Sequence, residues 1–261
     1  MKRERVDTPC STAEDIKATL MDMADAKQAK HMMRFFKTGR GEYGEGDQFL
    51  GINNPTVRMV VKEAWRGTSL DEAAKLVRDH WHEVRLCGLL ILVEKMLRAM
   101  KIKDEKERDD ECEKVYKMYV ALHQYINNWD LVDLSAIKIV GNWEVMHPEE
   151  ELMEEWIKLG DDKLWQRRIA MVSTWMLLRE GRFDAVVSRA ERMLESKQDL
   201  LHKAAGWMLR EMYKHEGEEV LEQFLRQHIG KMPSVMLSYA CEKMTQEEKE
   251  YWRRYRYSLA E

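Results

Sequence analysis

The sequence predicts an all-helical protein, an α-solenoid built from stacked pairs of helices. Three observations support this fold class. First, 44% of the 261 residues are hydrophobic and 34% are charged, with only 4 Pro, a balance that suits helices with one apolar and one charged face. Second, no run of residues alternates apolar and polar side chains for long enough to predict a strand. Third, four similar helical segments recur along the chain.

The helices can be placed in order from their patterns and breaks. A helical pattern covers 11–37, where Ser11 and Thr12 followed by Glu14 indicate an N-cap with a capping box. A Gly-rich loop follows over 38–54, and Pro55 closes it at a helix N1 position. Further helices are predicted near 56–65, 69–78, 81–102, 106–126, 129–140, 149–159, 163–180, 183–195, 199–214, 217–228, 232–243 and 246–257, separated by breaks that include "RGTS", "GNWEVMHP", "GDD", "EGR" and "HEGE".

Four of these helices occupy similar places in successive units. The segments are "WHEVRLCGLLIL" (81–92), "WDLVDLSAIKIV" (129–140), "WQRRIAMVSTWM" (165–176) and "LHKAAGWMLREM" (201–212). Their starts are 48, 36 and 36 residues apart, in or near the range of roughly 40–47 residues for HEAT and armadillo units. Each pair buries its apolar face by stacking on its neighbours. We therefore predict one solenoid domain over 1–261, with a flexible segment over 1–11, and a plain helical bundle as the alternative.

The charge and the cysteine content limit the kinds of partner that the protein can have and the cellular compartment that we expect for it. The net charge of −4, from 43 Lys and Arg against 47 Asp and Glu, argues mildly against a nucleic-acid partner. However, bases gather in "RFFKTGR" (34–40), "WQRR" (165–168) and "WRRYRY" (252–257), so an acidic exterior with a basic groove is open. The 4 cysteines form no C-x-x-C pair, and the start has no apolar signal region. The longest apolar stretch, "LCGLLILV" (86–93), is too short for a bilayer. We expect a cytoplasmic protein without a membrane partner.

The stretch "YINNWDLVDLS" (125–135) places Trp129 and Asp133 four residues apart, on one face of a helix. The recurring helices are candidates for the concave surface of a solenoid. On them lie three indoles, two guanidinium groups and one carboxylate: Trp129, Asp133, Trp165, Arg168, Trp207 and Arg210. Arg binds phosphates bidentately, and Trp offers a flat face to a base or a cation. A lone acid there would repel DNA unless it had a chemical role.

Five motifs extend this pattern over nearly the whole chain. They are "QFLGINNPTVRMVVKE" (48–63), "HEVRLCGLLILVEKM" (82–96), "NNWDLVDLSA" (127–136), "LWQRRIAMVSTW" (164–175) and "KAAGWMLREM" (203–212). In this order and spacing, over about 12–257, the sequence resembles the bacterial AlkD family of DNA alkylation repair glycosylases. The resemblance implies a right-handed α-solenoid of HEAT-like helical pairs with a concave DNA-binding cleft.

The resemblance also implies roles for individual residues. Trp129 and Asp133 match the catalytic-cleft pair of the family's W-D-x-x-D motif, and Arg168 matches the Arg of its W-x-x-R motif, which contacts the DNA backbone near the lesion. Trp207, in the G-W-x-L-R-E motif, is expected to be the second aromatic wall of the cleft. Tyr43 is the nearest match to a cleft-lining Tyr of the early loop. Arg210 is expected to contact DNA from the same wall.

The activity that the resemblance implies is excision of 3-methyladenine and 7-methylguanine, purines alkylated at N3 or N7, from double-stranded DNA, without flipping the base. Asp133 would stabilise positive charge on the sugar and orient or deprotonate the attacking water. Indole faces attract a cationic base. No metal or cofactor is needed, and we expect a monomer. The alternative is a non-catalytic HEAT-like scaffold that binds DNA or a protein, and Asp133 is the feature that separates the two functions.

Several of these residues also have structural interpretations. Trp129 can be a core residue, and Arg168 can pair with Asp161 or Asp162. We expect Trp143, Trp165 and Trp175 to be packing residues, and His82, His123, His147 and His202 to cap helices or pack. "WRRYRY" at 252–257 can contact DNA phosphates or form a solvated end, and the sequence leaves both open.

Overall fold

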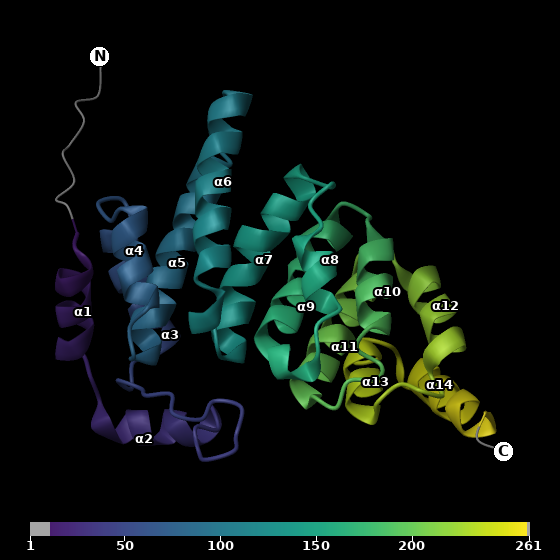
Figure 1. The fold of residues 1–261 in the computed structure, drawn as a ribbon. Coiled ribbons are helices and arrows are strands. Elements are labelled where there is room, and N and C mark those ends of the chain that lie inside the picture. The colour runs from purple at the N-terminus through teal and green to yellow at the C-terminus, as the bar shows by residue number, and fades with distance from the viewer. Residues whose placement is uncertain (1–10, 260–261) are drawn as a thin grey trace. The chain divides into compact units, whose positions relative to one another are not determined.

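The computed structural model describes residues 11–259 and consists of helices joined by loops (Figure 1). This part of the chain holds fourteen α-helices and two short 3-10 helices. It contains no strand, and an isolated bridge joins Gln48 to Trp81. The all-α prediction is confirmed. The predicted flexible segment over 1–11 lies outside the described residues, apart from Ser11.

The chain divides into two compact units, residues 1–135 and residues 136–261. The single solenoid domain over 1–261 therefore stays a prediction. The first unit contains α1 (Ala13–Asp22), α2 (Ala26–Phe35), α3 (Asn54–Ala64), α4 (Leu70–Val77), α5 (His82–Ala99), α6 (Glu105–Ala121), η1 (His123–Tyr125) and the start of α7 (Trp129–Met146). The second contains the rest of α7 with α8 (Leu152–Ile157), η2 (Asp161–Lys163), α9 (Leu164–Arg179), α10 (Phe183–Glu191), α11 (Asp199–Lys214), α12 (Glu218–His228), α13 (Ser234–Ala240) and α14 (Gln246–Ser258).

In the first unit the long helix α5 is the centre of the core. It packs against α3, α4 and α6, and α1 packs against α3 and α4. Because α5 is covered on several sides, every residue from His82 to Val93 is buried. This burial explains why its sequence reads as a nearly continuous apolar run rather than as a stripe. Gly88 lets α4 approach closely, since an added Cβ would lie 2.8 Å from the Ala73 carbonyl oxygen.

In the second unit the helices stack in successive pairs. Helix α9 packs against α8, α10 and α11, and α11 packs against α10, α12 and α13. Helices in contact are thus neighbours, or next but one, in chain order. This pattern is typical of a solenoid, in which each repeat contacts the next, and not of a bundle around one shared core. The predicted α-solenoid of helical pairs is confirmed.

A buried ion-pair network joins four helices of the second unit. Arg189 on α10 donates to Glu144 on α7, to Glu154 on α8 at 2.7 Å and to the carbonyl oxygen of Ala170 on α9 at 2.7 Å. Arg189 and Glu144 are both nearly inaccessible to solvent. The burial of Arg189 would lower its pKa, but the two carboxylates raise it, so the guanidinium stays charged. Removing one partner of such a network leaves an unpaired buried charge.

Helix boundaries differ from the predictions near the N-terminus. The predicted helical pattern over 11–37 is two helices, because Asp25 leaves the helical conformation and caps α2 through bonds from the amides of Lys27 and Gln28. The capping box at the start of α1 exists, but it joins Thr12 to Asp15 instead of using Glu14. Pro55 is the second helical residue of α3, not the first, since Asn53 is the N-cap.

Another difference concerns α7, which continues to Met146 through the predicted break "GNWEVMHP". Gly141 in this segment has a packing role. An added Cβ there would lie 2.6 Å from the Ser173 carbonyl oxygen. The glycine therefore permits close contact between α7 and α9 within the second unit.

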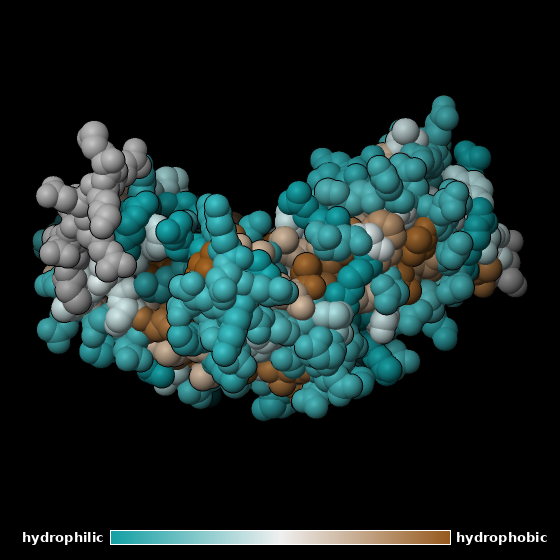
Figure 2. All heavy atoms as spheres, turned by 90° about the horizontal axis from the view of Figure 1, so that it is seen from above, coloured by the Kyte–Doolittle hydropathy of each residue, from teal (hydrophilic) through white to brown (hydrophobic). Residues whose placement is uncertain are grey.

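The hydropathy of the surface agrees with helices that turn an apolar face inward. Figure 2 shows one side of the molecule, on which hydrophilic residues predominate and hydrophobic residues form small groups. Within residues 11–259, none of the helices has the length and the apolar character needed to cross a bilayer.

The loop before α3 is clamped onto α5 by a buried carboxylate. Glu83 accepts hydrogen bonds from the amides of Leu50, Gly51 and Ile52 at 2.8, 2.8 and 3.1 Å. Gly51 has a φ of +88°, a conformation that glycine adopts without steric cost. An added Cβ would lie 2.1 Å from the Asp25 carbonyl oxygen. The close approach of this loop to the start of α2 therefore requires glycine.

We expect Gly51→Ala to lower the free energy of unfolding by about 3 kcal/mol or more, because backbone strain and a clash with a backbone oxygen combine. Gly46→Ala is the matched control, since Gly46 has a φ of +80° and nothing within 4 Å of an added Cβ. Strain alone should cost it about 1 kcal/mol. Urea unfolding measures both, and equal losses would contradict the close packing at Gly51.

Candidate functional site

The predicted pair Trp129 and Asp133 lies in the first turns of α7, on the part that belongs to the first unit. The Trp129 amide donates to the Asn128 side chain at 2.9 Å, and the Leu131 amide donates to Asp130 at 2.8 Å. These bonds satisfy amides that have no partner inside the helix. Trp129 and Asp133 are both half-buried, one turn apart, so the indole and the carboxylate share one side of the helix.

An aromatic cluster holds the indole of Trp129 in place. Its ring stacks on Phe36 with centroids 5.2 Å apart and an interplanar angle of 19°. Phe35 meets it edge-on at 5.9 Å, and the ring packs on the buried cluster of Ala29, Phe36 and Phe49. The structural interpretation of Trp129 is therefore partly correct. The residue is a packing residue, but part of its surface remains exposed on α7.

The carboxylate of Asp133 lies close enough to Tyr119 of α6 to affect its titration. Burial is the main cause that raises the pKa of the Tyr119 phenol, and the negative charge of Asp133 adds to it. The Tyr119 hydroxyl shares a 3.0 Å hydrogen bond with Ser135. Tyr119 is thus a neutral, fully buried neighbour of the acid.

Beneath Trp129 lies a buried chain of charges that the sequence interpretation missed. His82, at the start of α5, donates from Nδ1 to Asp47 at 2.7 Å and from Nε2 to Asp130 at 2.9 Å. All three side chains are at most 5% exposed. The ring of His82 also stacks on Phe49 with centroids 4.3 Å apart. One imidazole therefore joins the loop before α3 to the first turn of α7.

Arg85 completes this network. Its guanidinium donates to Asp47 at 2.7 Å and to the carbonyl oxygens of Asp79 and His80 at 3.2 and 3.0 Å. The Asn128 amide donates to Asp47 at 3.4 Å. Two carboxylates, one guanidinium and a doubly donating imidazole make an electrically balanced set. A balanced set is needed because an unpaired charge in the interior is costly.

The pKa values of this network follow from its geometry. Burial would lower the pKa of His82, but the charge and hydrogen bond of Asp130, with those of Asp47, raise it from 6.5 to about 9. Burial would raise the pKa of Asp47, but His82 and Arg85 lower it below its ordinary value. At neutral pH His82 is therefore a buried imidazolium between two carboxylates.

Two sequence signals point to this network. Asp130 is the first of the two acids in the motif that contains Trp129, and another of the five motifs opens with "HEVR", which contains His82 and Arg85. The expectation that His82 is a lone capping or packing residue is incomplete, because the motifs of His82 and of Asp130 each lie at the start of a helix. The starts of α5 and α7 lie together, so His82 and Asp130 come into contact.

Tyr43 lies half-buried in the turn that follows α2. Its neighbour Gly44 runs against the start of α7, since an added Cβ there would lie 2.5 Å from the Phe36 carbonyl oxygen and 3.3 Å from Asn128. The first unit thus brings the loop of Tyr43 to the residue that precedes Trp129.

Arg168, Trp207 and Arg210 lie in the second unit, on the contacting helices α9 and α11. Arg168 is buried and donates from Nη1 to the Leu200 carbonyl oxygen. Trp207 is half-buried. Arg210 donates to Glu211 at 2.9 Å and to Glu242, so contact with DNA would compete with two carboxylates.

Asp161 pairs with Arg167, the residue before Arg168. It also accepts bonds from Ser196 and from the Lys197 amide, both at 2.8 Å. This acid therefore joins the start of α9 to the segment before α11. Asp161, one of the two acids considered as a partner of Arg168, thus pairs with Arg167.

Trp143 and Trp175 have the structural contacts expected of packing residues. Trp143 is buried and stacks on His147 with centroids 3.7 Å apart. Trp175 is half-buried, and Lys138 and Arg179 each lie 5.0 Å from the centroid of its ring. Trp165 is half-buried as well.

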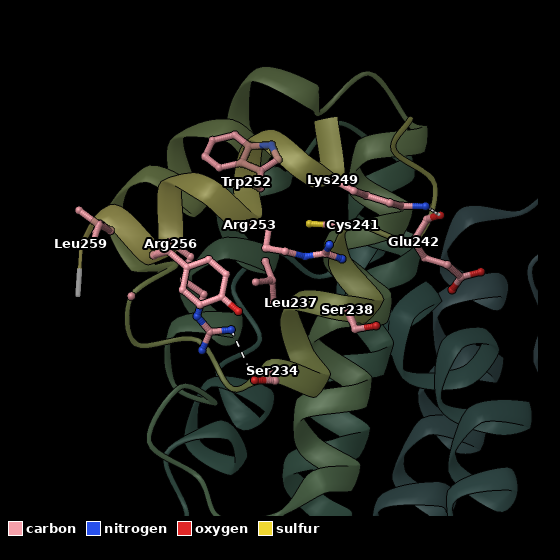
Figure 3. Close-up of a pocket in the computed structure, with 12 residues that line it drawn as sticks. Ser234, Leu237, Ser238, Cys241, Glu242, Lys249, Trp252, Arg253, Arg256 and Leu259 are labelled. Atoms are coloured by element: carbon pink, nitrogen blue, oxygen red, sulfur yellow. Dashed lines mark hydrogen bonds between the residues drawn. The ribbon is translucent and has the colours of Figure 1, made fainter. Parts of the chain in front are cut away.

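Figure 3 shows the C-terminal segment "WRRYRY" contributing Trp252, Arg253 and Arg256 to the lining of a cavity. Trp252 is buried, and Arg256 donates to the Met232 carbonyl oxygen at 2.7 Å. Arg253 is exposed and lines a cavity of about 820 Å³ with Ser238 and Cys241. Trp252 and Arg256 therefore have structural roles, and Arg253 faces the cavity.

Comparison with known proteins agrees with the fold. Residues 16–244 match the family model described as DNA alkylation repair enzyme. A solved structure described as a predicted DNA alkylation repair enzyme from Enterococcus faecalis is similar over 85% of this chain and 97% of its own, with a TM-score of 0.53 and 18% identity. No curated protein sequence matches the chain. At this identity the structural likeness shows the fold alone.

Proposed function

Because the chain belongs to the DNA alkylation repair enzyme family, we propose that it is a DNA glycosylase that excises N3- and N7-alkylated purines, such as 3-methyladenine and 7-methylguanine, from duplex DNA. Family membership supports a role in alkylation repair. The reaction type, the substrates and the monomeric state belong to the proposal.

One observation supports the reaction type above all others. A half-exposed indole and a half-buried carboxylate lie one turn apart on α7, and both have defined surroundings. Phe36 supports Trp129 from one side, and the buried network of Asp47, His82 and Asp130 lies under the same turn. Preorganised groups stabilise developing charge because they need not reorient during the reaction.

The chemistry needs these two side chains. An N3- or N7-alkylated purine is already cationic, so its bond to C1′ breaks with the electron pair leaving on the base, which becomes neutral. Positive charge then builds on the sugar, and Asp133 would stabilise it. Water adds to C1′ and gives up a proton, with Asp133 as the base that orients it. Trp129 would hold the cationic nucleotide by a cation–π contact of about 0.5–2 kcal/mol.

In this proposal the other sequence-predicted residues bind DNA. Arg168 would contact a backbone phosphate, with its orientation set by the bond to the Leu200 carbonyl oxygen, and Trp207 would supply a second aromatic surface. Tyr43 would line the cleft from the loop beside the start of α7. The lesion would stay stacked in the duplex. Arg210 is the weakest member, because Glu211 and Glu242 already neutralise it.

The test is incubation of the purified protein with methylated duplex DNA, followed by chromatography of the released bases. We expect free 3-methyladenine or 7-methylguanine well above the spontaneous rate, and we expect release to persist in EDTA because no metal takes part. Binding to duplex DNA without release above the spontaneous rate would support the non-catalytic scaffold instead.

A further inference from the structure

Helices α3 and α5 pack side by side in the first unit (Figure 1). A basic groove is lined by residues of these two helices and of the turns that follow them. The cavity measures about 730 Å³ and is lined by five cations and an indole, Arg58, Lys62, Arg66, Arg98, Lys101 and Trp65. One carboxylate, Glu94, also lines it, so five positive charges against one negative charge leave a net charge of +4. We refer to this feature as the α3–α5 groove.

The five cations of the α3–α5 groove are exposed and form no ion pair with another residue of 11–259. Some exposed lysines of the same unit have partners at helical spacing, while others, such as Lys106, form no ion pair within residues 11–259. Lys114 pairs with Glu111 at 2.6 Å, and Lys117 pairs with Glu113 at 2.7 Å. In a chain with 47 acidic residues, five neighbouring cations without a carboxylate partner are not explained by surface ion pairing.

Stability of the fold does not explain this groove either. Arg58 and Lys62 lie at i and i+4 on α3, and Arg66 lies in the turn just after the helix. Like charges at i and i+4 destabilise a helix, so Arg58 and Lys62 form an unfavourable pair on α3. Arg66 stacks over Trp65 at 4.6 Å from the ring centroid, which orients its guanidinium while leaving the N–H edges available for an anion.

The geometry points to a polyanion and not to a single small anion. From Arg58 to the end of α3 at Ala64 the helix rises about 9 Å, and Arg66 lies two residues beyond that end. A strand of duplex DNA carries one phosphate for about every 3.4 Å along its axis. Arg98, in the last turn of α5, and Lys101, just after that helix, extend the charge on the facing side. One phosphate would reach only two or three of these five cations.

We propose that the α3–α5 groove binds the sugar–phosphate backbone of duplex DNA. This inference rests on the proposed function, because that function supplies the duplex as ligand. It adds a binding surface built from residues that have no role in the proposed function. Backbone binding is independent of sequence and of the lesion, so the groove would hold undamaged DNA as well.

The test uses the double variant Lys62→Glu/Arg98→Glu and fluorescence anisotropy with an unmodified duplex, from about 50 to 200 mM salt. Removing two phosphate contacts should reduce the slope of log K against log salt by about 2 and weaken binding at least tenfold. The matched control is Arg78→Glu/Lys106→Glu. These two cations are exposed, make no ion pair within residues 11–259 and lie outside the groove.

The control should keep the wild-type slope within about 0.5, because its two cations contact no phosphate. Lys62→Ala/Arg98→Ala should also lower the slope, and it should melt no lower than the wild type because one repulsion along α3 is relieved. If both groove variants keep the slope of the control, the inference is wrong. It is equally wrong if a few millimolar inorganic phosphate displaces the duplex, since that result indicates a small-anion site.

These outcomes separate the groove from the proposed chemistry. In the first case the wild-type protein releases no base, while the groove variants lose duplex affinity and show a smaller salt slope. That result would support DNA binding by the groove and contradict the glycosylase activity. In the opposite case the wild-type protein releases the base and the groove variants bind the duplex as the control does. That result would contradict DNA binding by the groove and support the glycosylase activity.

Discussion

Asp133→Asn is expected to lower the rate of 3-methyladenine release from methylated duplex DNA by about 100-fold or more. Removing one preorganised group that stabilises transition-state charge typically costs a factor of about 10² to 10³. The amide has nearly the same size as the carboxylate but cannot neutralise a cationic sugar or accept a proton from water. Single-turnover release of the base, followed by chromatography, measures the effect directly.

Binding of undamaged duplex DNA should be unchanged or tighter in this variant, because a negative charge is removed from a surface proposed to face DNA. Asp110→Asn is the matched control, since this acid is exposed on α6 and its replacement changes the net charge equally. It should keep wild-type release. Wild-type release by Asp133→Asn, with an unchanged melting temperature, would remove Asp133 from the mechanism.

His82→Ala is expected to lower the free energy of unfolding by about 3–5 kcal/mol, because it leaves Asp47 and Asp130 as buried acids that have lost a shared cation. Arg85 remains beside Asp47, but within residues 11–259 the His82 ring is the one cation that contacts Asp130. A loss of this size should lower the melting temperature by roughly 10 °C in a chain of this length.

His80→Ala is the control two residues away. The side chain of His80 is 57% exposed and meets Asp79 at 3.4 Å, so its removal should change stability by less than about 0.5 kcal/mol. Thermal and urea unfolding of both variants test the prediction. Equal stability of His82→Ala and His80→Ala would show that the buried chain of charges does not contribute to the fold.

The same network predicts how stability depends on pH. The pKa of His82 is raised from 6.5 to about 9 in the folded state. Its contribution to stability is therefore complete below pH 6.5 and is lost as the pH rises through about 9, a change of about 3 kcal/mol. Because the pKa of Asp47 is lowered from 3.8, its contribution is present above that value and is lost in stronger acid. His82→Ala should lack the alkaline loss.

The network also indicates how the fold supports the proposed site. His82 connects Asp47, which follows the turn of Tyr43, to Asp130, the residue between Trp129 and the rest of α7. Glu83 clamps the next part of the same loop through three amides. Two consecutive residues at the start of α5 therefore hold the loop against the helix that carries Asp133.

The sequence by itself determined the helical class and most helix positions, because apolar spacing and capping residues act within a few residues of the chain. Trp129 and Asp133 share a helix, so their spacing alone predicted a common face, and α7 has them there. Helix ends were less predictable. Glycine at 141 reads as a break, but the close contact with the Ser173 carbonyl oxygen is what requires it.

Tertiary structure alone decided which charges meet. Asp47 and His82 are 35 residues apart in sequence, and His82 and Asp130 are 48 apart. The cations of the α3–α5 groove come from two helices and the turns that follow them. Arg210 matched a DNA-binding wall by position, yet Glu242 of a later segment pairs with it. Local periodicity predicts which face of a helix is apolar. The partner of a charge depends on which helices pack together, and that is set by the summed burial of many side chains.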